Sequence, residues 1–277
     1  MIIPKVKILV LIALWGITFQ LKAQISTSFT VIKVSGKVVS KILNRQIKSG
    51  DIVKPDDRLI FDTKDAYVHV INAEGTKTIR NIPDNSPREF MQLMQTFLSP
   101  DSKNKATRGV ENSSYEKIKS VLKEDTLLIL GNGYISIDTT ETSLHKPAAV
   151  KAKFSVNNEK VSLLISTETG YHLGKEELFF KTPGMMSYPK VTVVYYEDIG
   201  DPIHKASVLL GSFTPLYIDE VELQKEVKII IKSLNDSKIS NDHLFKEITG
   251  YLWSEYAAPI EENVKAWLDG NELLIKH

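Results

Sequence analysis

The stretch from Phe29 to Ile82 constrains the fold more than any other part of the chain. In it, short runs of β-branched and aromatic residues alternate with clusters of Gly, Pro, Ser and Asp that are typical of turns. The predicted strands are Phe29–Val34, Lys37–Ile42, Arg58–Asp62, Ala66–Asn72 and Lys77–Ile82. Gly36 and Gly50 are expected in turns because a positive φ costs glycine little. Short strands joined by tight turns predict a small β barrel or sandwich.

The alternation over residues 66–71 predicts which side chains share a face of the sheet, since residues two apart in a strand point the same way. The face that we expect to be buried carries Ala66, Val68 and Val70. The other, more exposed face carries Tyr67, His69 and Ile71. His69 is therefore predicted to be a surface side chain rather than a ligand or a catalytic group.

The order of glycines, acids and core residues in this stretch resembles the FecR-type β domain of bacterial envelope proteins. The matching positions are Val34-x-Gly36-x-Val38, Ile47-x-x-Gly50-Asp51-x-Val53-x-x-x-Asp57-x-Leu59, Thr63 with Ala66-x-Val68, and Glu74-Gly75-Thr76. The resemblance covers about a fifth of the chain. It implies a β-rich module used in envelope signalling and binding, without catalytic residues. The whole chain also resembles uncharacterised exported proteins of the Bacteroidota.

Residues 1–23 have the order of a secretory signal peptide. Lys5 and Lys7 precede an apolar run from Ile8 to Leu21, and Ala23 supplies a small residue before the expected cleavage point. The apolar run is shorter than the roughly 20 residues that a membrane-spanning helix needs, which disfavours an uncleaved anchor. We therefore expect an exported protein, periplasmic or extracellular, with no stable membrane insertion after cleavage.

Composition excludes several kinds of partner and chemistry. The chain has 277 residues, of which 42% are hydrophobic and 25% charged, as is ordinary for globular proteins. Removing the signal peptide leaves 32 of the 35 basic residues against 34 acidic ones, a formal charge of −2. Mixed, nearly balanced charges give no electrostatic footprint for nucleic acid. The absence of cysteine excludes disulfides, thiolate metal sites and a cysteine nucleophile from this chain.

Changes of pattern divide the expected mature chain into three parts: residues 24–82, 83–125 and 126–277. The first is the β module, and the third is a C-terminal α+β domain. The middle part is predicted to hold a helix from Ser86 to Leu98, followed by a mobile polar linker and a short helix.

Turn signals in the C-terminal domain predict two β-hairpins. Asn132, with a glycine on each side, separates the apolar runs Leu127–Leu130 and Tyr134–Ile137. An Asn-Asn-Glu turn separates Val150–Val156 from Lys160–Ser166 in the same way.

Further along the chain, two continuous apolar runs indicate strands that are buried on both faces. They are Val191–Tyr196 and Ser207–Gly211, joined by a turn-rich connection. Phe213–Ile218 is predicted to form another strand, and Pro215 places it at an edge or a bulge.

The last third of the chain has the period of amphipathic helices. Capping patterns predict three helix starts, at Asp219 with Glu222, at Ser240 or Asn241, and at Pro259 with Glu261 and Glu262. The side chains expected to face inward are Leu223, Val227, Ile230, Ile231, Leu234, Leu244, Phe245, Ile248, Leu252, Tyr256, Ile260, Val264, Trp267 and Leu268. Gly270 is expected to end the third helix. Blocks of strands followed by helices predict an α+β fold in which three helices close a unit of β-hairpins.

No motif predicts a catalytic residue, a metal ligand or a cofactor site, and the binding residues are unknown. The histidines are scattered, and no two have the spacing of a zinc helix: His69, His145, His172, His204, His243 and His277. Three adjacent acid pairs are expected to be solvated loop or helix-start charges: Asp56-Asp57, Glu176-Glu177 and Glu261-Glu262. Gly170–Lys175 resembles a phosphate-binding loop, but its glycines are one residue too close.

The C-terminal domain is rich in aromatic residues: Tyr171, Tyr188, Tyr195, Tyr196, Tyr217, Tyr251, Trp253 and Tyr256. Ordinary core and surface positions are the favoured interpretation, and a binding surface is the alternative.

We therefore predict an exported, non-catalytic binding or adaptor protein of the bacterial cell envelope, with a protein or cell-wall partner. Whether the chain is an enzyme stays open, and the alternative function is that of a hydrolase whose site is assembled from distant residues. A hydrolase predicts a deep cleft with a strongly perturbed acid or histidine. A binding module predicts an apolar or aromatic patch on a flat or convex surface.

Overall fold

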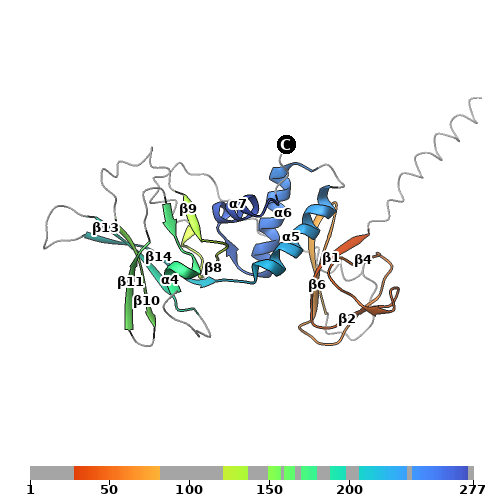
Figure 1. The fold of residues 1–277 in the computed structure, drawn as a ribbon. Helices are drawn as coiled ribbons and strands as arrows, with labels where there is room; N and C mark the ends of the chain where they lie inside the picture. The colour runs from red at the N-terminus through yellow and green to blue at the C-terminus, as the bar shows by residue number, and fades with distance from the viewer. Residues whose placement is uncertain are drawn as a thin grey trace, which may run out of the picture. The chain divides into compact units, whose positions relative to one another are not determined.

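The computed structural model describes residues 28–81, 121–136, 149–156, 159–165, 170–179, 188–197, 206–235 and 239–273. The chain divides into two compact units, residues 1–101 and 102–277. The described part is mixed α+β, mostly sheets with three longer helices, as the sequence predicts (Figure 1). The predicted signal peptide, the Ser86–Leu98 helix and the polar linker lie outside the described residues.

Within residues 28–81, the N-terminal unit has seven short strands in two sheets, in the orders β4-β1-β6-β7 and β3-β2-β5. Their bounds are β1 Phe29–Ser35, β2 Val38–Ser40, β3 Arg45–Gln46, β4 Ile52–Val53, β5 Leu59–Phe61, β6 Tyr67–Asn72 and β7 Gly75–Arg80. The five predicted strands are confirmed, and β3 and β4 were missed. The two sheets are not closed into a barrel in this part of the chain, and residues of both contribute to one hydrophobic cluster.

The predicted turn glycines have the expected backbone conformation. Gly36 has φ +76° and Gly50 has φ +88°, both in the left-handed region. At Gly36 a Cβ would also lie 2.8 Å from the Cβ of Ala66, so both the backbone and the space favour glycine there.

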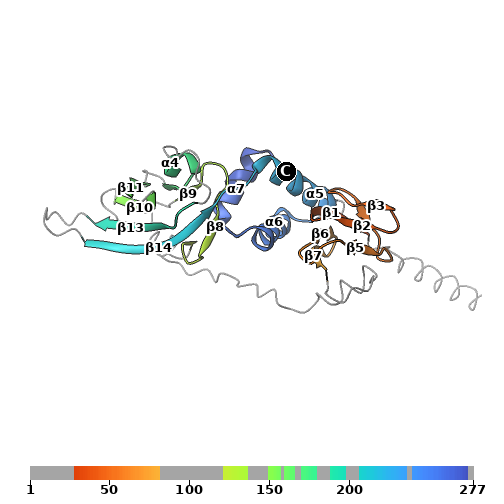
Figure 2. The same ribbon diagram turned by 90° about the horizontal axis from the view of Figure 1, so that it is seen from below.

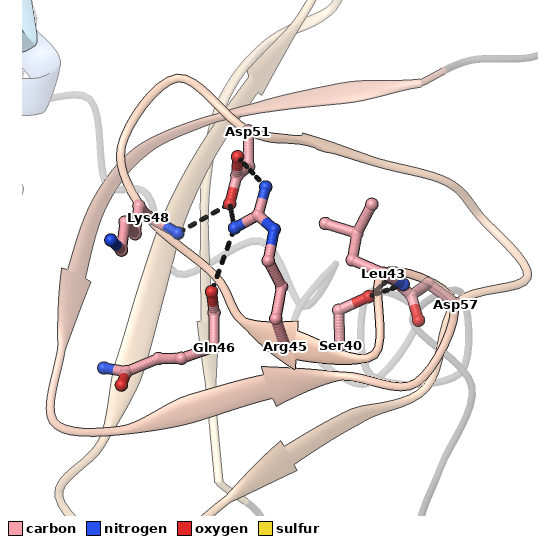
Figure 3. A network of polar contacts seen from close by, with 7 residues as sticks. All are labelled: Ser40, Leu43, Arg45, Gln46, Lys48, Asp51 and Asp57. Atoms are coloured by element: carbon pink, nitrogen blue, oxygen red, sulfur yellow. Dashed lines mark hydrogen bonds and ion pairs between the residues drawn. The ribbon is translucent and has the colours of Figure 1, made fainter.

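A salt bridge holds the turn between β3 and β4 (Figure 3). The guanidinium of Arg45 donates two hydrogen bonds of 2.7 Å to the two carboxylate oxygens of Asp51. Asp51 also accepts a bond of 2.8 Å from the backbone N–H of Lys48, and Arg45 donates one of 3.0 Å to the backbone oxygen of Gln46. The hydrogen bond from Arg45 lowers the pKa of the Asp51 carboxyl below its ordinary value.

Asp57 corrects the prediction that adjacent acids are solvated. Its side chain is buried, at 1% exposure, and accepts hydrogen bonds from the hydroxyl of Ser40 and, at 3.0 Å, from the backbone N–H of Ile42. The same hydroxyl accepts a bond of 2.9 Å from the N–H of Leu43 (Figure 3). The carboxylate therefore satisfies the backbone of the turn after β2, which the charge pattern of the sequence did not reveal.

The prediction that His69 is exposed is also wrong. Its side chain is 3% exposed, and its Nδ1 lies 2.9 Å from the hydroxyl of Thr78 on the neighbouring strand β7. β6 is an interior strand of its sheet, and every residue from Val68 to Asn72 is buried. A strand buried on both faces does not obey a rule of alternating exposure.

In the C-terminal unit, six of the described strands form one sheet, in the order β11-β10-β13-β14-β8-β15. Figure 2 shows β13 and β14 of this sheet side by side. Their bounds are β8 Thr126–Leu128, β10 Ala149–Val156, β11 Glu159–Leu164, β13 Val191–Glu197, β14 Ala206–Leu216 and β15 Ala258–Pro259. Two further strands pair separately, β9 Tyr134–Ser136 with β12 Gly170–His172. A short helix follows β12, α4 Lys175–Phe179.

One predicted hairpin is confirmed and the other is wrong. β10 and β11 pair antiparallel, from Lys151 opposite Leu164 to Val156 opposite Glu159. β8 and β9 do not pair with each other, because β8 pairs in parallel with β14 and β15 while β9 pairs with β12. The glycines on both sides of Asn132 do have positive φ, so the turn was predicted correctly but the pairing of its strands was not.

β14 is one strand of 11 residues, whereas the sequence predicted two strands and burial on both faces. Leu209 is 59% exposed, so only one face of β14 is covered there. Pro215 lies beyond Phe213, where the pairing with β13 ends, and its neighbours Thr214 and Leu216 make the backbone bonds to the β8 segment. The missing N–H of Pro215 therefore points away from β8, beyond the end of the pairing with β13.

A β-bulge in β14 requires a glycine. The register between β13 and β14 shifts at Val193 and Val194, so that Leu210 is the extra residue. A Cβ on the adjacent Gly211 would lie 2.5 Å from the Cβ of Leu122 and 2.8 Å from its backbone oxygen. The close approach of Leu122 therefore excludes any larger residue at this position without a shift of the backbone.

The three predicted C-terminal helices are present: α5 Glu220–Asn235, α6 Asn241–Glu255 and α7 Glu261–Gly270. Asp219 caps α5 by accepting a bond of 2.9 Å from the N–H of Val221, and Ser240 caps α6 by accepting one from His243. The predicted inward residues are buried, except that Ile231, Phe245 and Tyr256 are half-buried. None of the described helices is long and apolar enough to cross a membrane.

Polar side chains hold α5 and α7 to the turn after β8. The amide of Asn263 accepts a bond of 2.7 Å from the N–H of Leu130 and donates one of 2.8 Å to its backbone oxygen. Glu220 accepts bonds from the N–H of Gly131 at 2.7 Å and from the indole of Trp267 at 2.8 Å. These contacts join residues more than 40 positions apart, and they fix the turn against two helices.

Candidate functional site

Over β11, β10, β13 and the first part of β14, one face of the sheet is covered and the other, the open face, carries solvent-exposed side chains. On β10 the buried side chains of Val150, Ala152 and Phe154 alternate with partly or fully exposed ones at Lys151, Lys153 and Ser155. The covered face packs in one cluster with residues of β12 and α4 and of the loop that joins them: Tyr171, Leu173, Leu178 and Phe179. The opposite face of β10 therefore presents Lys151, Lys153 and Ser155.

The strand register places two exposed leucines, Leu164 and Leu209, at the ends of one row of four residues that also contains Lys151 and the buried Val194. Leu164 of β11 lies opposite Lys151 of β10, which lies opposite Val194 of β13, which in turn lies opposite Leu209 of β14. Because neighbouring strands are about 4.8 Å apart, the row extends over about 14 Å. Leu164 is 62% exposed and Leu209 is 59% exposed, while Val194 between them is 8% exposed.

A second, polar row lies beside the first. It consists of Ser162, Lys153, Thr192 and Ser212 on the same four strands. Two leucines held more than half exposed gain free energy when they are covered, at about 25 cal/mol per Å² of apolar surface. The hydroxyl groups beside them can bond a covering partner. The chemistry that this face offers is recognition, and we take it as the candidate functional site.

The helices also bring together an acid and two tyrosines that are far apart in the sequence. Glu226 of α5 accepts hydrogen bonds from the hydroxyls of Tyr251, at 2.9 Å, and Tyr256, at 2.6 Å. Glu226 is 7% exposed and Tyr251 is fully buried. Burial, and then the charge of Glu226, raise the pKa of Tyr251 above its ordinary value. Both groups are shielded from solvent and bonded to each other, so their contacts join α5 to α6.

Neither the histidines nor the paired acids form a reactive cluster in the part of the chain that the structure describes. The ring of His172 lies 5.0 Å from that of Tyr134, and His243 lies 3.9 Å from Glu247 on the surface of α6. Across the described ranges, no group of three or more His, Cys, Asp or Glu residues could hold a metal ion. His145, His204 and His277 lie outside these ranges.

Most of the described aromatic residues take core positions, which agrees with the favoured interpretation of ordinary core and surface positions. The ring of Phe179 lies 5.1 Å from those of Phe154 and Tyr188, and the rings of Tyr188 and Tyr217 are 4.8 Å apart. Trp253 is the exception among the described members, with 53% of its side chain exposed on α6. The side chains of Tyr195 and Tyr196 are outside the described set.

Sequence reasoning missed Leu164 because it placed this residue in a predicted strand without assigning it a face. It missed Leu209 because the run Ser207–Gly211 was predicted to be buried on both faces. A signal was present in β10, where lysines at 151 and 153 alternate with apolar residues and mark one face as solvent-exposed. The residues opposite them could be assigned to that face only once the register was known.

Comparison with family models, with curated proteins and with solved structures gives no match to this chain.

Proposed function

We propose that the protein is an exported, non-catalytic binding or adaptor protein of the bacterial cell envelope, and that its C-terminal unit holds a protein partner on the open sheet face. The signal-peptide pattern of residues 1–23 supports export to the periplasm or beyond. The observation that carries the binding function is the row with Leu164 and Leu209 at its two ends, both more than half exposed.

The composition of the face favours a protein partner. Protein interfaces combine an apolar centre with a polar surround that forms hydrogen bonds. Here the row that ends in Leu164 and Leu209 is flanked by the row of hydroxyl groups and Lys153. Lys160 is exposed at the edge of the same face. Single exposed apolar residues are normal on a protein surface, whereas an aligned set on a flat sheet marks an interaction site.

We also propose that residues 29–82 are a FecR-like β module, which supports a role in the envelope. The structural roles of the matching residues agree with this. Gly36 and Gly50 adopt turn conformations, and Asp51 and Asp57 bind the backbone of neighbouring turns. Such roles explain why these residue types stand at these spacings, and none of them requires a reaction.

The test compares two variants with equal loss of exposed apolar surface. Leu209→Thr removes one end of the row and keeps a residue suited to a strand. Ile52→Thr is the matched control, because Ile52 is also 59% exposed and also lies in a strand, but in β4 of the other unit. Each chain is expressed with residues 1–23 and a C-terminal tag and is cross-linked in the envelope of its native host, and the partners are identified by mass spectrometry.

We expect the wild type and Ile52→Thr to recover the same one or two proteins, and Leu209→Thr to lose them. Equal recovery by both variants would remove the sheet face from the proposal. A chain that captures no stable partner, and that hydrolyses a substrate, would overturn it in favour of the alternative function.

A further inference from the structure

β11 is an edge strand whose outer side has no partner among the described residues. It lies at the end of the strand order, and its pairing is with β10 alone. It has six residues, Glu159–Leu164, without proline or glycine. An edge of this kind offers a row of unsatisfied backbone groups that can bind another strand.

The hydrogen-bond pattern shows which backbone groups point outward. The N–H of Ile165 donates a bond of 3.0 Å to the backbone oxygen of Val150, so these two residues form a hydrogen-bonded pair. Along an antiparallel ladder, hydrogen-bonded pairs alternate with pairs that are not hydrogen-bonded. Leu163 and Val161, which lie two and four residues before Ile165, therefore also bond to β10. The N–H and C=O groups of Leu164, Ser162 and Lys160 therefore point away from β10, to the open edge.

We propose that two copies of this chain associate through β11, antiparallel, with Ser162 of each copy opposite Ser162 of the other. The sheet of one copy then continues into the sheet of the second. This inference rests on the strand edge. It shares Leu164 with the open face, and the variant at Leu209 distinguishes the two proposals.

This register is the one that satisfies the outward groups of each copy. With Ser162 on the two-fold axis, Lys160 lies opposite Leu164 of the second copy, and Leu164 lies opposite Lys160. Each of these three residues then exchanges two backbone bonds with the residue opposite, as in any hydrogen-bonded antiparallel pair. A shift by two residues leaves the outward groups of either Leu164 or Lys160, depending on its direction, beyond the end of the other strand.

The side chains are complementary in the same register. On the open face, the exposed Leu164 lies beside the aliphatic stem of Lys160, which covers apolar surface while its ammonium stays in water. On the other face, Val161 lies opposite Leu163 of the second copy. Both are half-buried and pack against the hydrophobic core, so the pairing completes their burial. No two like charges stand opposite each other.

A second copy fits this edge better than an unrelated strand because the sequence is complementary to itself. A two-fold contact uses the same surface twice and closes, so that no edge of β11 is left for further growth. An unrelated strand would need its own complementary order of apolar and polar residues, which nothing in this chain specifies.

The first test is a disulfide across the axis. The chain has no cysteine, so Ser162→Cys introduces a single thiol. Opposite Cα atoms in a hydrogen-bonded pair are about 5.5 Å apart, within the range that a disulfide spans. Ser155→Cys is the matched control, since Ser155 is exposed on the same face but lies on β10, opposite Lys160. Under mild oxidation we expect a covalent dimer of Ser162→Cys and a monomer of Ser155→Cys.

The second test concerns the register. Lys160→Cys and Leu164→Cys, mixed, are expected to form a mixed disulfide, whereas neither alone forms a dimer at a comparable rate. Cross-linking of Lys160→Cys with itself would show a different register and overturn the one proposed.

The third test uses the unmodified chain. Its mass in solution, measured over a wide range of concentration, is expected to rise from that of the monomer to that of the dimer. Ser162→Pro removes an outward N–H that β10 does not use, so it is expected to give a folded monomer, while Ser162→Thr keeps the dimer. Circular dichroism checks that both variants fold like the wild type.

A wild type that stays monomeric, with equal cross-linking of Ser162→Cys and Ser155→Cys, would overturn the proposal. So would a monomer whose envelope partner is lost on Ser162→Pro, because the edge would then bind a strand of that partner. Neither result changes the outcome expected for Leu209→Thr, because Leu209 lies on β14, three strands away from β11.

Discussion

The two units of the chain use their polar side chains in different ways. In the N-terminal unit the described strands have between 2 and 7 residues, and side chains such as Asp51 and Asp57 bind the backbone of adjacent turns. In the C-terminal unit β14 reaches 11 residues, and side chains such as Asn263 hold helices to a distant turn. Short strands supply few ladder bonds, so the first unit depends more on its turns.

The exposed apolar residues differ in the same way. In the N-terminal unit Ile42, Ile52 and Ile60 are exposed, but they lie in a turn, in β4 and in β5, in different sheets. In the C-terminal unit Val221 and Trp253 are exposed separately on helices, but Leu164 and Leu209 belong to one row on one face. A row can be covered by one partner, whereas scattered residues cannot. This difference is the reason for assigning the interaction to the C-terminal unit.

The largest effect is expected from Asp57→Ala, which tests whether polar contacts hold the turns of the N-terminal unit. Two donors, the hydroxyl of Ser40 and the N–H of Ile42, would lose their charged acceptor in a buried site. The expected cost is about 3 kcal/mol, and hydrogen exchange in β2 and β5 should accelerate by about 100-fold.

Asp57→Asn is the control for this prediction. It keeps an oxygen for the N–H of Ile42 and should lose less than half as much stability. The comparison between the units fails if Asp57→Ala accelerates exchange in α5 to α7 as much as in β2 and β5.

A smaller effect is expected from Gly211→Ala, which tests the bulge that shapes the C-terminal sheet. The added Cβ would lie 2.5 Å from that of Leu122 and would push against its backbone. Overpacking of this kind costs about 2 kcal/mol. Gly250→Ala is the matched control, because a Cβ there meets nothing within 4 Å and the residue lies inside α6. It should raise stability by about 0.5 to 1 kcal/mol in thermal unfolding. Equal effects of both variants would contradict the crowding at Gly211.

The sequence predicted local features well and long-range pairings poorly. The cap at Asp219, the turn glycines and the β10–β11 hairpin depend on residues close in sequence, and all three are confirmed. The parallel pairing of β8 with β14 and β15 joins segments about 90 and 130 residues apart. No turn residue encodes such a pairing, so the Asn-Gly signal led to the wrong partner for β8.

The burial of polar side chains was also predicted poorly, because it too depends on contacts between residues far apart in the sequence. Asp57, His69 and Glu226 are buried because hydroxyl and N–H groups from other segments bond to them. Residue type alone places acids and histidines on the surface, and their hydrogen-bond partners become visible only in the folded chain. The candidate site was missed in the same way, since the row of Leu164 and Leu209 exists only in the register of four strands.

A further prediction concerns Tyr251 and the dependence of stability on alkaline pH. Its pKa is raised in the folded chain, so it keeps its proton where the unfolded chain loses it, above about pH 10. The unfolded state then binds fewer protons, and stability falls as the pH rises. Tyr251→Phe should cost about 1 kcal/mol at pH 8, through the lost bond to Glu226. Its stability should then fall less steeply than that of the wild type above pH 10. Parallel curves from chemical unfolding would contradict this.

The smallest effect is expected at the Arg45–Asp51 pair, which lies at the surface of the N-terminal unit. The hydrogen bond from Arg45 lowers the pKa of Asp51 in the folded chain. The stability that the pair contributes is therefore present above the ordinary value of about 3.9 and is lost as the pH falls through the folded value. The direct measurement is an NMR titration of the Asp51 carboxyl.

In Arg45→Gln the midpoint of this titration should rise toward the ordinary value. In Arg45→Lys it should lie between the two, because lysine keeps the charge but cannot donate the paired bonds of a guanidinium. The bond of 2.8 Å from the N–H of Lys48 remains in both variants and should hold the midpoint slightly below that of a free aspartate. An unchanged midpoint in Arg45→Gln would show that the backbone of the turn alone sets the pKa. The side chain of Arg45 would then contribute nothing to this turn. The N-terminal unit would depend on backbone hydrogen bonds, as the C-terminal unit does in its long strands, and the two units would not differ in this respect.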